Sequence, residues 1–365
     1  MNDQELNIKF VKEVEKHQEV YNYKLPDYSR KDVTEKAWQE VAAELNMTEM
    51  ETKTLILPSP STINEIYSEL DTSEEKMELD IKILKEWMQK QPHLPNPDDD
   101  EKLIDEKRIK MFLIMCKNSL EKTKVKLDQH YTIKLSIPEH YSKWDPTSPE
   151  MVQAMKLSYF VPLPKPTHEG HRVTIQCVRT EDADNYVFKD HVKMYIMELD
   201  LRIAKLDIYK KDVIIFDAKN TTMNHVTSIL PYFKKAIESL LAAYPLRLHE
   251  IHFINVKSFV HPLVNVGLSL LKKKLANRAF NHKSVEELKS YIDPSILPLD
   301  YGGTYPKMSD EIVDDWHDEM MKHREWFIAQ SSIVADNSKR PKNSNNDLDN
   351  FENAIEGSFR KLEVD

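Results

Sequence analysis

The chain has 365 residues and a net charge of −10, so it can bury a sizeable core and form two or three structural units. The acidic balance argues against a general nucleic-acid binder, because affinity for phosphate backbones rests on a basic excess. Two cysteines, Cys116 and Cys177, argue against a disulfide framework or zinc site and favour a reducing cytosol. With neither a signal pattern nor a run of about 18 apolar residues, we expect a soluble protein.

The first half of the chain reads as helices. Apolar spacing predicts two helices over residues 6–46, and Pro58 and Pro60 then indicate a linker over residues 48–61. Further helices are predicted from Ile63 to Met88, from Leu103 to Met115 and from Ser119 onward. Together they predict a small helical bundle that ends near Pro138.

From Trp144 on, strands alternate with helices. A proline loop within residues 151–177 leads into a β-branched strand. Helix 187–206, strand 213–216, helix 226–243, strand 250–256 and a long apolar helix at 260–280 follow. The order predicts an α/β fold with a mostly parallel sheet and right-handed crossovers. A helix at 310–329 precedes a polar tail that begins at Ser331.

Motifs for catalysis and metal binding are missing from the sequence. The chain has five glycines and lacks GxGxxG, GxxxxGK[ST] and GxSxG, which argues against nucleotide-dependent enzymes and α/β-hydrolases. His168 and His171, and His249 and His252, show HxxH spacing, but neither pair is accompanied by further ligands. Asp217 at a strand end has no base or nucleophile beside it. We therefore predict no catalytic residue, no metal and no cofactor.

Several segments carry a resemblance to a known family. YPLRLHEIHFINV and LPLDYGG, the lead-in segments WMQKQPHLP, FLIMCKNSLEKTKVKLD and YTIKLSIPEHY, and the closing EGSFRKLEVD lie within residues 57–365. This region resembles the CRAL-TRIO lipid-transfer proteins, especially insect proteins similar to alpha-tocopherol transfer protein and cellular retinaldehyde-binding protein. The resemblance implies a mixed, mostly parallel sheet flanked by helices, after a small helical bundle.

The opening segment resembles a different family. FVKEVEKHQEVYNYKLPDYSRKDVTEKAWQEVAAEL is similar to the first two helices of a MADF domain, a Myb-like DNA-binding fold, without its basic third helix. We expect a partial MADF-like segment at 1–48, a helical bundle at 57–138, a lipid-binding domain at 144–305, and a C-terminal helix with a flexible tail at 306–365.

The resemblance implies a pocket for one hydrophobic ligand. Its floor would come from alternating strand positions that share a face, namely Ile214, Phe216, Ile251 and Phe253. The wall would come from the helix between those strands, namely Val226, Leu240 and Tyr244. The cover would be the helix at 260–280, namely Val264, Leu268 and Leu271. The alternative is that these side chains are ordinary core residues.

The resemblance also implies a phosphoinositide site. Arg247, Lys274 and Arg278 match positions that bind phosphoinositide headgroups, such as phosphatidylinositol bisphosphate, in tocopherol-transfer relatives. Helical spacing places Lys274 and Arg278 one turn apart. His249 replaces an expected basic residue, which weakens the site or makes it pH-sensitive. Met111 and Ile114 stand where relatives have arginines. The alternative is a lysine-rich helix end that offsets its dipole.

These observations lead to one functional hypothesis and one rival. We expect a monomeric, cytoplasmic protein, peripheral to anionic membranes, that carries a retinoid, a tocopherol or a phosphoinositide-type lipid and catalyses no reaction. The cover helix 260–280 would touch the membrane and swing away, so that ligand exchanges. The rival is a transcriptional or adaptor protein that binds DNA or a partner through its MADF-like segment, although the acidic charge makes nucleic acid an improbable ligand.

Overall fold

The computed structural model describes residues 12, 15–18, 33, 54–97 and 106–341. Contacts divide the chain into two compact units, residues 1–56 and residues 57–365. Most of the two helices predicted over residues 6–46, the start of the predicted helix at Leu103 and the closing segment EGSFRKLEVD lie outside the described residues. The predicted helical bundle and lipid-binding domain fall within the same compact unit.

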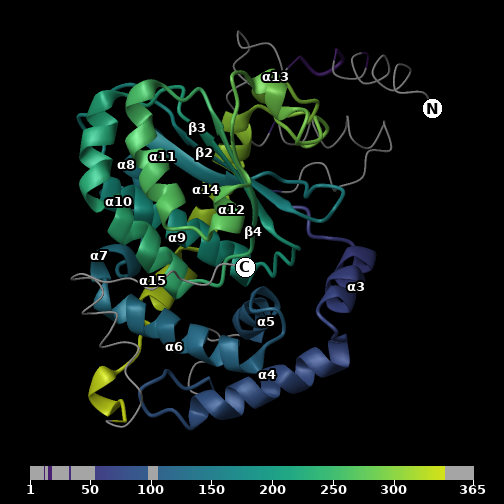
Figure 1. Cartoon of the computed structure of the whole chain (residues 1–365), viewed down its shortest axis with the longest axis vertical. Helices are drawn as coiled ribbons and strands as arrows, with labels where there is room; N and C mark the ends of the chain where they lie inside the picture. Colours follow the sequence, from purple (N-terminus) through teal and green to yellow (C-terminus); the bar gives the residue numbers. More distant parts are fainter. Residues whose placement is uncertain (1–11, 13–14, 19–32, 34–53, 98–105, 342–365) are drawn as a thin grey trace. The chain divides into compact units, whose positions relative to one another are not determined.

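The lead-in part of the second unit is helical (Figure 1). It contains α3 (Pro60–Glu69), α4 (Glu74–Gln89), α5 (Glu106–Met115), α6 (Leu120–Ser136) and α7 (Pro138–Tyr141). Three of these helices begin after a serine whose hydroxyl accepts a hydrogen bond from a first-turn amide, namely Ser59, Ser73 and Ser119. The linker predicted over residues 48–61 ends earlier than expected, because Pro60 occupies the first turn of α3.

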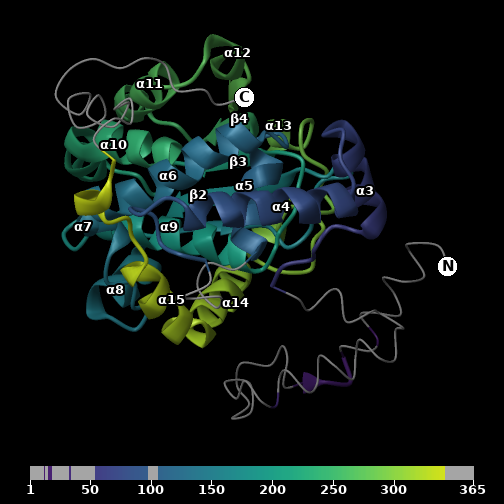
Figure 2. The same ribbon diagram turned by 90° about the horizontal axis from the view of Figure 1, so that it is seen from below.

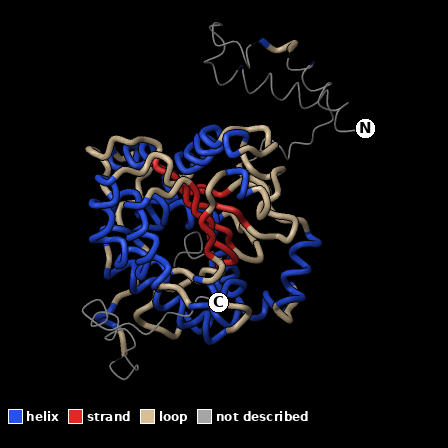
Figure 3. Tube along the Cα trace, turned by 45° about the horizontal axis from the view of Figure 1, so that its top comes forward, coloured by secondary structure: helices blue, strands red, loops and turns tan. Residues whose placement is uncertain are grey.

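A five-stranded sheet forms the centre of the unit, among helices (Figure 3). The strands are β1 (Ser158–Pro162), β2 (Arg172–Val178), β3 (Asp212–Asp217), β4 (Leu248–Ile254) and β5 (Ala279–Asn281), and they lie in sequence order. β1 is antiparallel to β2, and the remaining pairs are parallel. The mixed, mostly parallel sheet is confirmed, although the sequence predicted one strand where α8 (Pro149–Leu157), β1 and β2 occur.

Two crossover helices cover one face of the sheet. α9 (Phe188–Ala204) connects β2 to β3, and α10 (Met223–Ala243) connects β3 to β4. The other face is lined by Tyr159, Val173, Ile175 and Ile215, each at most 2% exposed. On that side, α14 (Ser309–Lys322) packs on β1, and the hydroxyl of Tyr301, in η5 (Leu299–Tyr301), lies 3.2 Å from that of Tyr159.

The single helix predicted over residues 260–280 is wrong. The segment contains η4 (Ser258–Val260), α11 (His261–Ser269), a turn, α12 (Lys273–Ala276) and β5. The chain turns because Leu271 and Leu275 are buried against the sheet, which brings the following residues to the edge of β4. Figure 2 shows α11 and α12 outside α10 and β4.

The helix predicted over residues 310–329 is also divided. α14 ends at Lys322, and α15 (Arg324–Ser332) begins after His323, whose Nδ1 lies 2.8 Å from the carbonyl oxygen of Glu319. The remaining short helices are α13 (Val285–Leu288) and η6 (Asn337–Lys339).

A buried ion pair joins the lead-in helices to the sheet domain. Both terminal nitrogens of Arg108 on α5 donate to the carboxylate of Asp200 on α9, each at 2.8 Å. The hydroxyl of Tyr244 donates to the same carboxylate at 2.9 Å. Burial alone would raise the pKa of Asp200, but the Arg108 guanidinium lowers it to about 2. The pair therefore stays charged inside the protein.

We expect Asp200→Ala to lower the free energy of unfolding by about 3–5 kcal/mol, because it leaves the Arg108 charge buried without its carboxylate. Urea denaturation followed by circular dichroism measures the change. Glu106→Ala is the control, since Glu106 pairs with Lys85 at 3.0 Å while its side chain is 66% exposed, and its loss should cost under about 1 kcal/mol. Equal losses of unfolding free energy in the two variants would contradict the stabilising role of the Arg108–Asp200 ion pair.

Candidate functional site

The predicted floor residues lie together on one face of the sheet. Ile214 on β3 pairs with Ile251 on β4, and Phe216 pairs with Phe253 two residues further on. The rings of Phe216 and Phe253 stack, with centroids 5.4 Å apart and planes 15° apart. Since side chains alternate across a strand, all four point toward the face that carries α9 and α10.

Part of the predicted wall and cover meets this floor. One apolar cluster joins the floor to α10, to the end of α11, to the turn that follows α11 and to α12. These segments contribute Ile237, Leu241, Leu268, Leu271 and Leu275. Leu268 and Leu271 were predicted from the resemblance, whereas Ile237, Leu241 and Leu275 were not. The helical period alone places the inner face of α10 only to within about one residue, so it did not separate Leu241 from Leu240.

The other predicted wall and cover residues lie apart from the floor. Val226 and Val264 belong to a second cluster, with Ala218 and Val260. Leu240 is half-buried on α10. Tyr244 is 1% exposed and bonds Asp200, and its ring lies edge-on to His130 of α6 at 5.0 Å. The structure thus directs Tyr244 toward the lead-in helices.

The apolar layer beneath α11 is incompletely buried. Ile214, Phe216 and Phe253 are only half-buried, although they lie on central strands of a covered sheet, and no residue of α11 is buried. α11 contacts α10 at Gly267, where an added Cβ would lie 3.5 Å from the Phe233 ring. Full packing is the rule in protein interiors, so this apolar layer is an exception that needs a reason.

Positive side chains gather at the opposite end of the strands from Asp217. Lys211, Arg247 and Arg278 directly precede β3, β4 and β5, and parallel strands begin at the same edge of a sheet. Burial first, and then the charges of Arg278 and Arg247, lower the pKa of Lys211. Lys274 is exposed on α12, one turn before Arg278. Sequence reasoning missed Lys211, although its place before a strand was visible.

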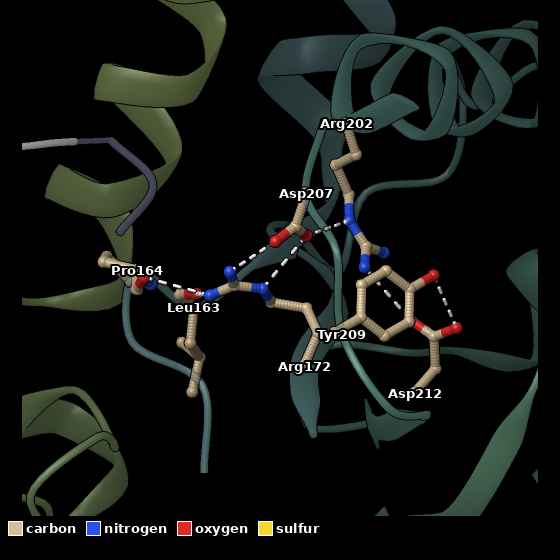
Figure 4. Close-up of polar contacts among 7 residues, drawn as sticks. All are labelled: Leu163, Pro164, Arg172, Arg202, Asp207, Tyr209 and Asp212. Carbon is tan, nitrogen blue, oxygen red and sulfur yellow. Dashed lines mark hydrogen bonds and ion pairs between the residues drawn. The ribbon is translucent and has the colours of Figure 1, made fainter. Parts of the chain in front are cut away.

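A buried charge network lies at the starts of β2 and β3 (Figure 4). Arg172 donates to both carboxylate oxygens of Asp207, at 3.0 and 2.5 Å. Arg202 bridges Asp207 and Asp212, each at 3.1 Å, and the Tyr209 hydroxyl donates to Asp212 at 2.9 Å. Burial opposes ionisation, but Arg172 and Arg202 lower the pKa of Asp207. The network fixes the beginnings of β2 and β3 relative to α9.

Neither of the two HxxH pairs forms a site of its own, because at least one histidine of each pair contacts a histidine outside that pair instead. His171 stacks on His249, with centroids 4.2 Å apart, whereas Nδ1 of His252 lies 2.9 Å from Nε2 of His282. Among the described residues, no group of three or more His, Cys, Asp or Glu side chains is placed to hold a metal ion. Burial, with smaller contributions from Lys211 and Arg278, lowers the pKa of His249.

Asp217 has a structural environment. Its carboxylate accepts hydrogen bonds from the Asn255 amide at 2.7 Å and from the Tyr301 hydroxyl at 2.8 Å, so it links the ends of β3 and β4 to η5. Met111 and Ile114, the departures from the family pattern, are buried in the core at 2% and 0% exposure.

Two surface depressions lie elsewhere in the second unit. One is lined by residues of α3 and the start of α4, from Asn64 to Lys76, and the other by α4 together with Glu106. Neither is lined by a predicted ligand-binding residue. No helix in the described ranges is long and apolar enough to cross a membrane.

Comparisons with known proteins agree with this architecture. Residues 156–303 match the family model of the CRAL/TRIO domain. The match covers less than half of the chain, and over these residues the chain is similar to the CRAL-TRIO family. Residues 73–151 match the Pinta-like UBA domain, and residues 10–56 match the family described as alcohol dehydrogenase transcription factor Myb/SANT-like.

Among curated relatives, this chain is similar to Clavesin-2 of Rattus norvegicus, with 25% identity over 288 residues, 78% of this chain and 85% of that protein. Clavesin-1 of Xenopus laevis is 23% identical and covers 68% of this chain and 74% of its own length. A solved structure, "Crystal structure of Sfh5", is 13% identical, with a TM-score of 0.40 over 69% of this chain and 90% of that one. At the family level, this similarity supports lipid binding and transfer.

Proposed function

We propose that this protein binds one small hydrophobic ligand in the apolar layer between the sheet and helices α10 and α11, and transfers it between membranes. The observation that carries the proposal is the half-buried state of Ile214, Phe216 and Phe253 beneath α11, a helix with no buried residue. Apolar side chains at the centre of a covered sheet normally lose all contact with water. A bound lipid would complete their burial.

The energetics suit reversible carriage. A ligand that removes ~400 Å² of apolar surface from water gains roughly 10 kcal/mol at ~25 cal/mol/Å². Ordering and immobilisation costs remove part of this gain. The remainder is enough for binding without a covalent step, so neither a nucleophile nor a cofactor is needed.

The proposed route for exchange is movement of α11. Its apolar residues make few buried contacts, so displacing it costs little of the core. The turn at residues 270–272 separates α11 from Leu275, which is 2% exposed and anchors α12 on the cluster below it. Contact between the apolar side chains of α11 and a bilayer would favour the displaced position, because both apolar surfaces then leave water.

A larger side chain in the apolar layer tests whether a ligand binds there. We expect Ile214→Trp to reduce the amount of lipid that co-purifies with the protein, measured by native mass spectrometry, while unfolding stability falls by less than about 1 kcal/mol. The matched control is Ile215→Trp, the next residue on β3, which is 0% exposed on the fully packed face. Overpacking there should cost about 1–3 kcal/mol or more. Unchanged lipid occupancy in Ile214→Trp would rule out this layer as the site.

The cationic edge is the second element of the proposal. We infer that Arg247, Arg278 and Lys274, together with Lys211, bind an anionic phosphoinositide headgroup. Lys211, Arg247 and Arg278 converge because each precedes a parallel strand. Burial first, and then the charges of Arg278 and Arg247, lower the pKa of Lys211. A multiply charged phosphate would relieve this like-charge repulsion.

We expect the double variant Lys274→Ala/Arg278→Ala to bind vesicles that contain phosphatidylinositol bisphosphate about 30-fold more weakly than the parent, since each cation near an anionic surface contributes about 1 kcal/mol. Vesicle co-sedimentation at fixed salt measures the change. Lys322→Ala/Lys339→Ala removes the same charge from side chains that are 72% and 63% exposed elsewhere on the unit. If both double variants lose vesicle affinity to a similar extent, net charge alone explains the effect and the headgroup site is contradicted.

His249 should make this binding pH-dependent. The charged and titratable groups that act on it are His171, Lys211, Arg278, Glu250 and Glu169. Burial lowers the pKa of His249, so the free protein holds it neutral near pH 7. An anionic headgroup favours the protonated ring, so binding takes up a proton and strengthens as pH falls below about 6.5.

We therefore expect the vesicle affinity of the parent, divided by that of His249→Gln, to rise between pH 7.5 and pH 5.5. The ratio cancels the titration of the phosphate groups, which both proteins meet equally. A ratio that does not change with pH would exclude His249 from the headgroup site.

A second candidate function belongs to the first unit. The family match over residues 10–56 favours DNA recognition or a protein contact by the MADF-like segment. That segment contains ten acidic and seven basic residues. Since phosphate neutralisation dominates affinity for DNA, the charge favours a protein partner. A gel-shift assay on the full chain at low salt distinguishes the two.

A further inference from the structure

One buried carboxyl group in the sheet domain has no visible partner. Glu198 on α9 is 1% exposed, and neither of its carboxyl oxygens has a hydrogen-bond partner among the residues that the structure describes. Such a group normally costs several kcal/mol when it is buried. The observation therefore calls for a bound group that the protein chain itself does not provide.

Its neighbours on α9 show where Glu198 is directed. Tyr195 and Arg202 lie one turn before and one turn after it on the same helical face. The Tyr195 hydroxyl lies 3.4 Å from the Gln176 amide of β2, and Arg202 donates to Asp212, the first residue of β3. Glu198 is therefore directed at the sheet between these two points.

The sheet position between those points is also polar and without a partner. Thr174 lies between Arg172, which is level with Asp212, and Gln176 on β2, and it pairs with Ile214 of β3. Its hydroxyl is buried and has no hydrogen-bond partner among the described residues. Glu198 on α9 and Thr174 on β2 thus lie on the two surfaces that the helix and the sheet turn toward each other.

This polar pair adjoins the apolar layer of the proposed ligand site. Thr174 and Gln176 pair with Ile214 and Phe216, so their side chains lie on the same face as the apolar floor. A ligand whose chain covers Phe216 and Phe253 would place one end near Ile214 and therefore near Thr174. The site then has an apolar body and a polar end, as small-ligand pockets usually do.

The chemistry of the pair selects an uncharged headgroup. Burial raises the pKa of Glu198 well above its usual value, so the carboxyl keeps its proton and presents one donor and one acceptor. The nearest cation on its helix, Arg202, already bonds Asp207 and Asp212. Arg202 is therefore not available to balance an anionic headgroup, whereas an alcohol can both donate and accept.

We propose that Glu198 and Thr174 form the polar end of the interior ligand site and that the ligand is a neutral lipid alcohol. The inference rests on the proposed lipid-binding function and names its substrate class. No covalent step is involved, since the alcohol only exchanges hydrogen bonds with water for hydrogen bonds with these two side chains.

The test compares tetradecan-1-ol, tetradecane and tetradecanoate as competitors of a neutral fluorescent probe, N-phenyl-1-naphthylamine, bound to the full chain. We expect the parent to prefer the alcohol over the alkane by about five- to tenfold, as one or two net hydrogen bonds imply. Tetradecanoate should bind more weakly than the alcohol. Glu198→Leu should abolish the preference, Glu198→Gln should keep part of it, and Thr174→Val should reduce it.

The outcomes separate this inference from the function on which it rests. If the parent binds neither alkane nor alcohol, the proposed interior site itself fails. If the parent binds both equally, or if Glu198→Leu keeps the alcohol preference, the polar end is overturned while lipid binding stands.

Because the preference is a ratio measured within one variant, partial unfolding does not imitate the expected result. Thermal unfolding without ligand supplies a second readout. Removing a buried carboxyl without a partner should leave Tm unchanged or raise it. A large fall in Tm together with an unchanged preference would show that Glu198 is held by a structural water only.

Discussion

The geometry of the sheet domain depends on the buried network of Arg172, Asp207, Arg202 and Asp212. Asp207 is 0% exposed and lies in the loop between α9 and β3, where it accepts hydrogen bonds from β2 and α9. Two arginines and two aspartates balance in charge, so the network is tolerable in the interior only when every member is present. It fixes how α9 crosses the sheet, and therefore where Tyr195 meets Gln176 of β2.

The two faces of the sheet are packed differently, and the difference has a structural origin. On one face, the hydroxyl of Tyr301 in η5 forms hydrogen bonds with Tyr159 of β1 and Asp217 of β3. These bonds hold the segment before α14 against both strands. On the other, α11 is followed by a turn rather than by more helix, and it contacts α10 through Gly267. If α11 moves as proposed, the opposite face of the sheet stays packed and supports the moving helix.

The sequence predicted the regular part of this arrangement well. Residues 213–216 and 250–256 read as buried strands, and β3 and β4 occur within two residues of those bounds. Both signals depend on local periodicity and strand propensity, which survive in the fold. The cover was predicted as one helix because its apolar spacing continues through Leu271 and Leu275. The helix is interrupted where residues 279–281 pair with β4. This pairing is long-range, so the spacing of apolar residues does not show it.

In the candidate site too, contacts that follow from local sequence patterns could be predicted, whereas contacts that depend on the topology could not. The pairing of Ile214 with Ile251 follows from alternation within strands, so it could be predicted. Lys211 joins Arg247 and Arg278 only because three strands begin at one edge, and that depends on topology. Glu198 could not be found from sequence, since a glutamate on a helix is usually solvated. Only the orientation of α9 shows that it points inward.

The two proposed sites are connected through the segment that follows α11. Leu271 and Leu275 belong to the same cluster as the apolar floor, and Arg278 follows Leu275 by three residues, where its carbonyl oxygen accepts from Ile251 of β4. A headgroup bound at Arg278 and a lipid bound above Ile251 therefore share one short stretch of chain. If displacement of α11 alters the position of α12, each ligand changes the affinity of the other by the same factor, because binding free energies around a cycle must balance. A membrane that carries the headgroup would then also be the place where the interior lipid is released or loaded.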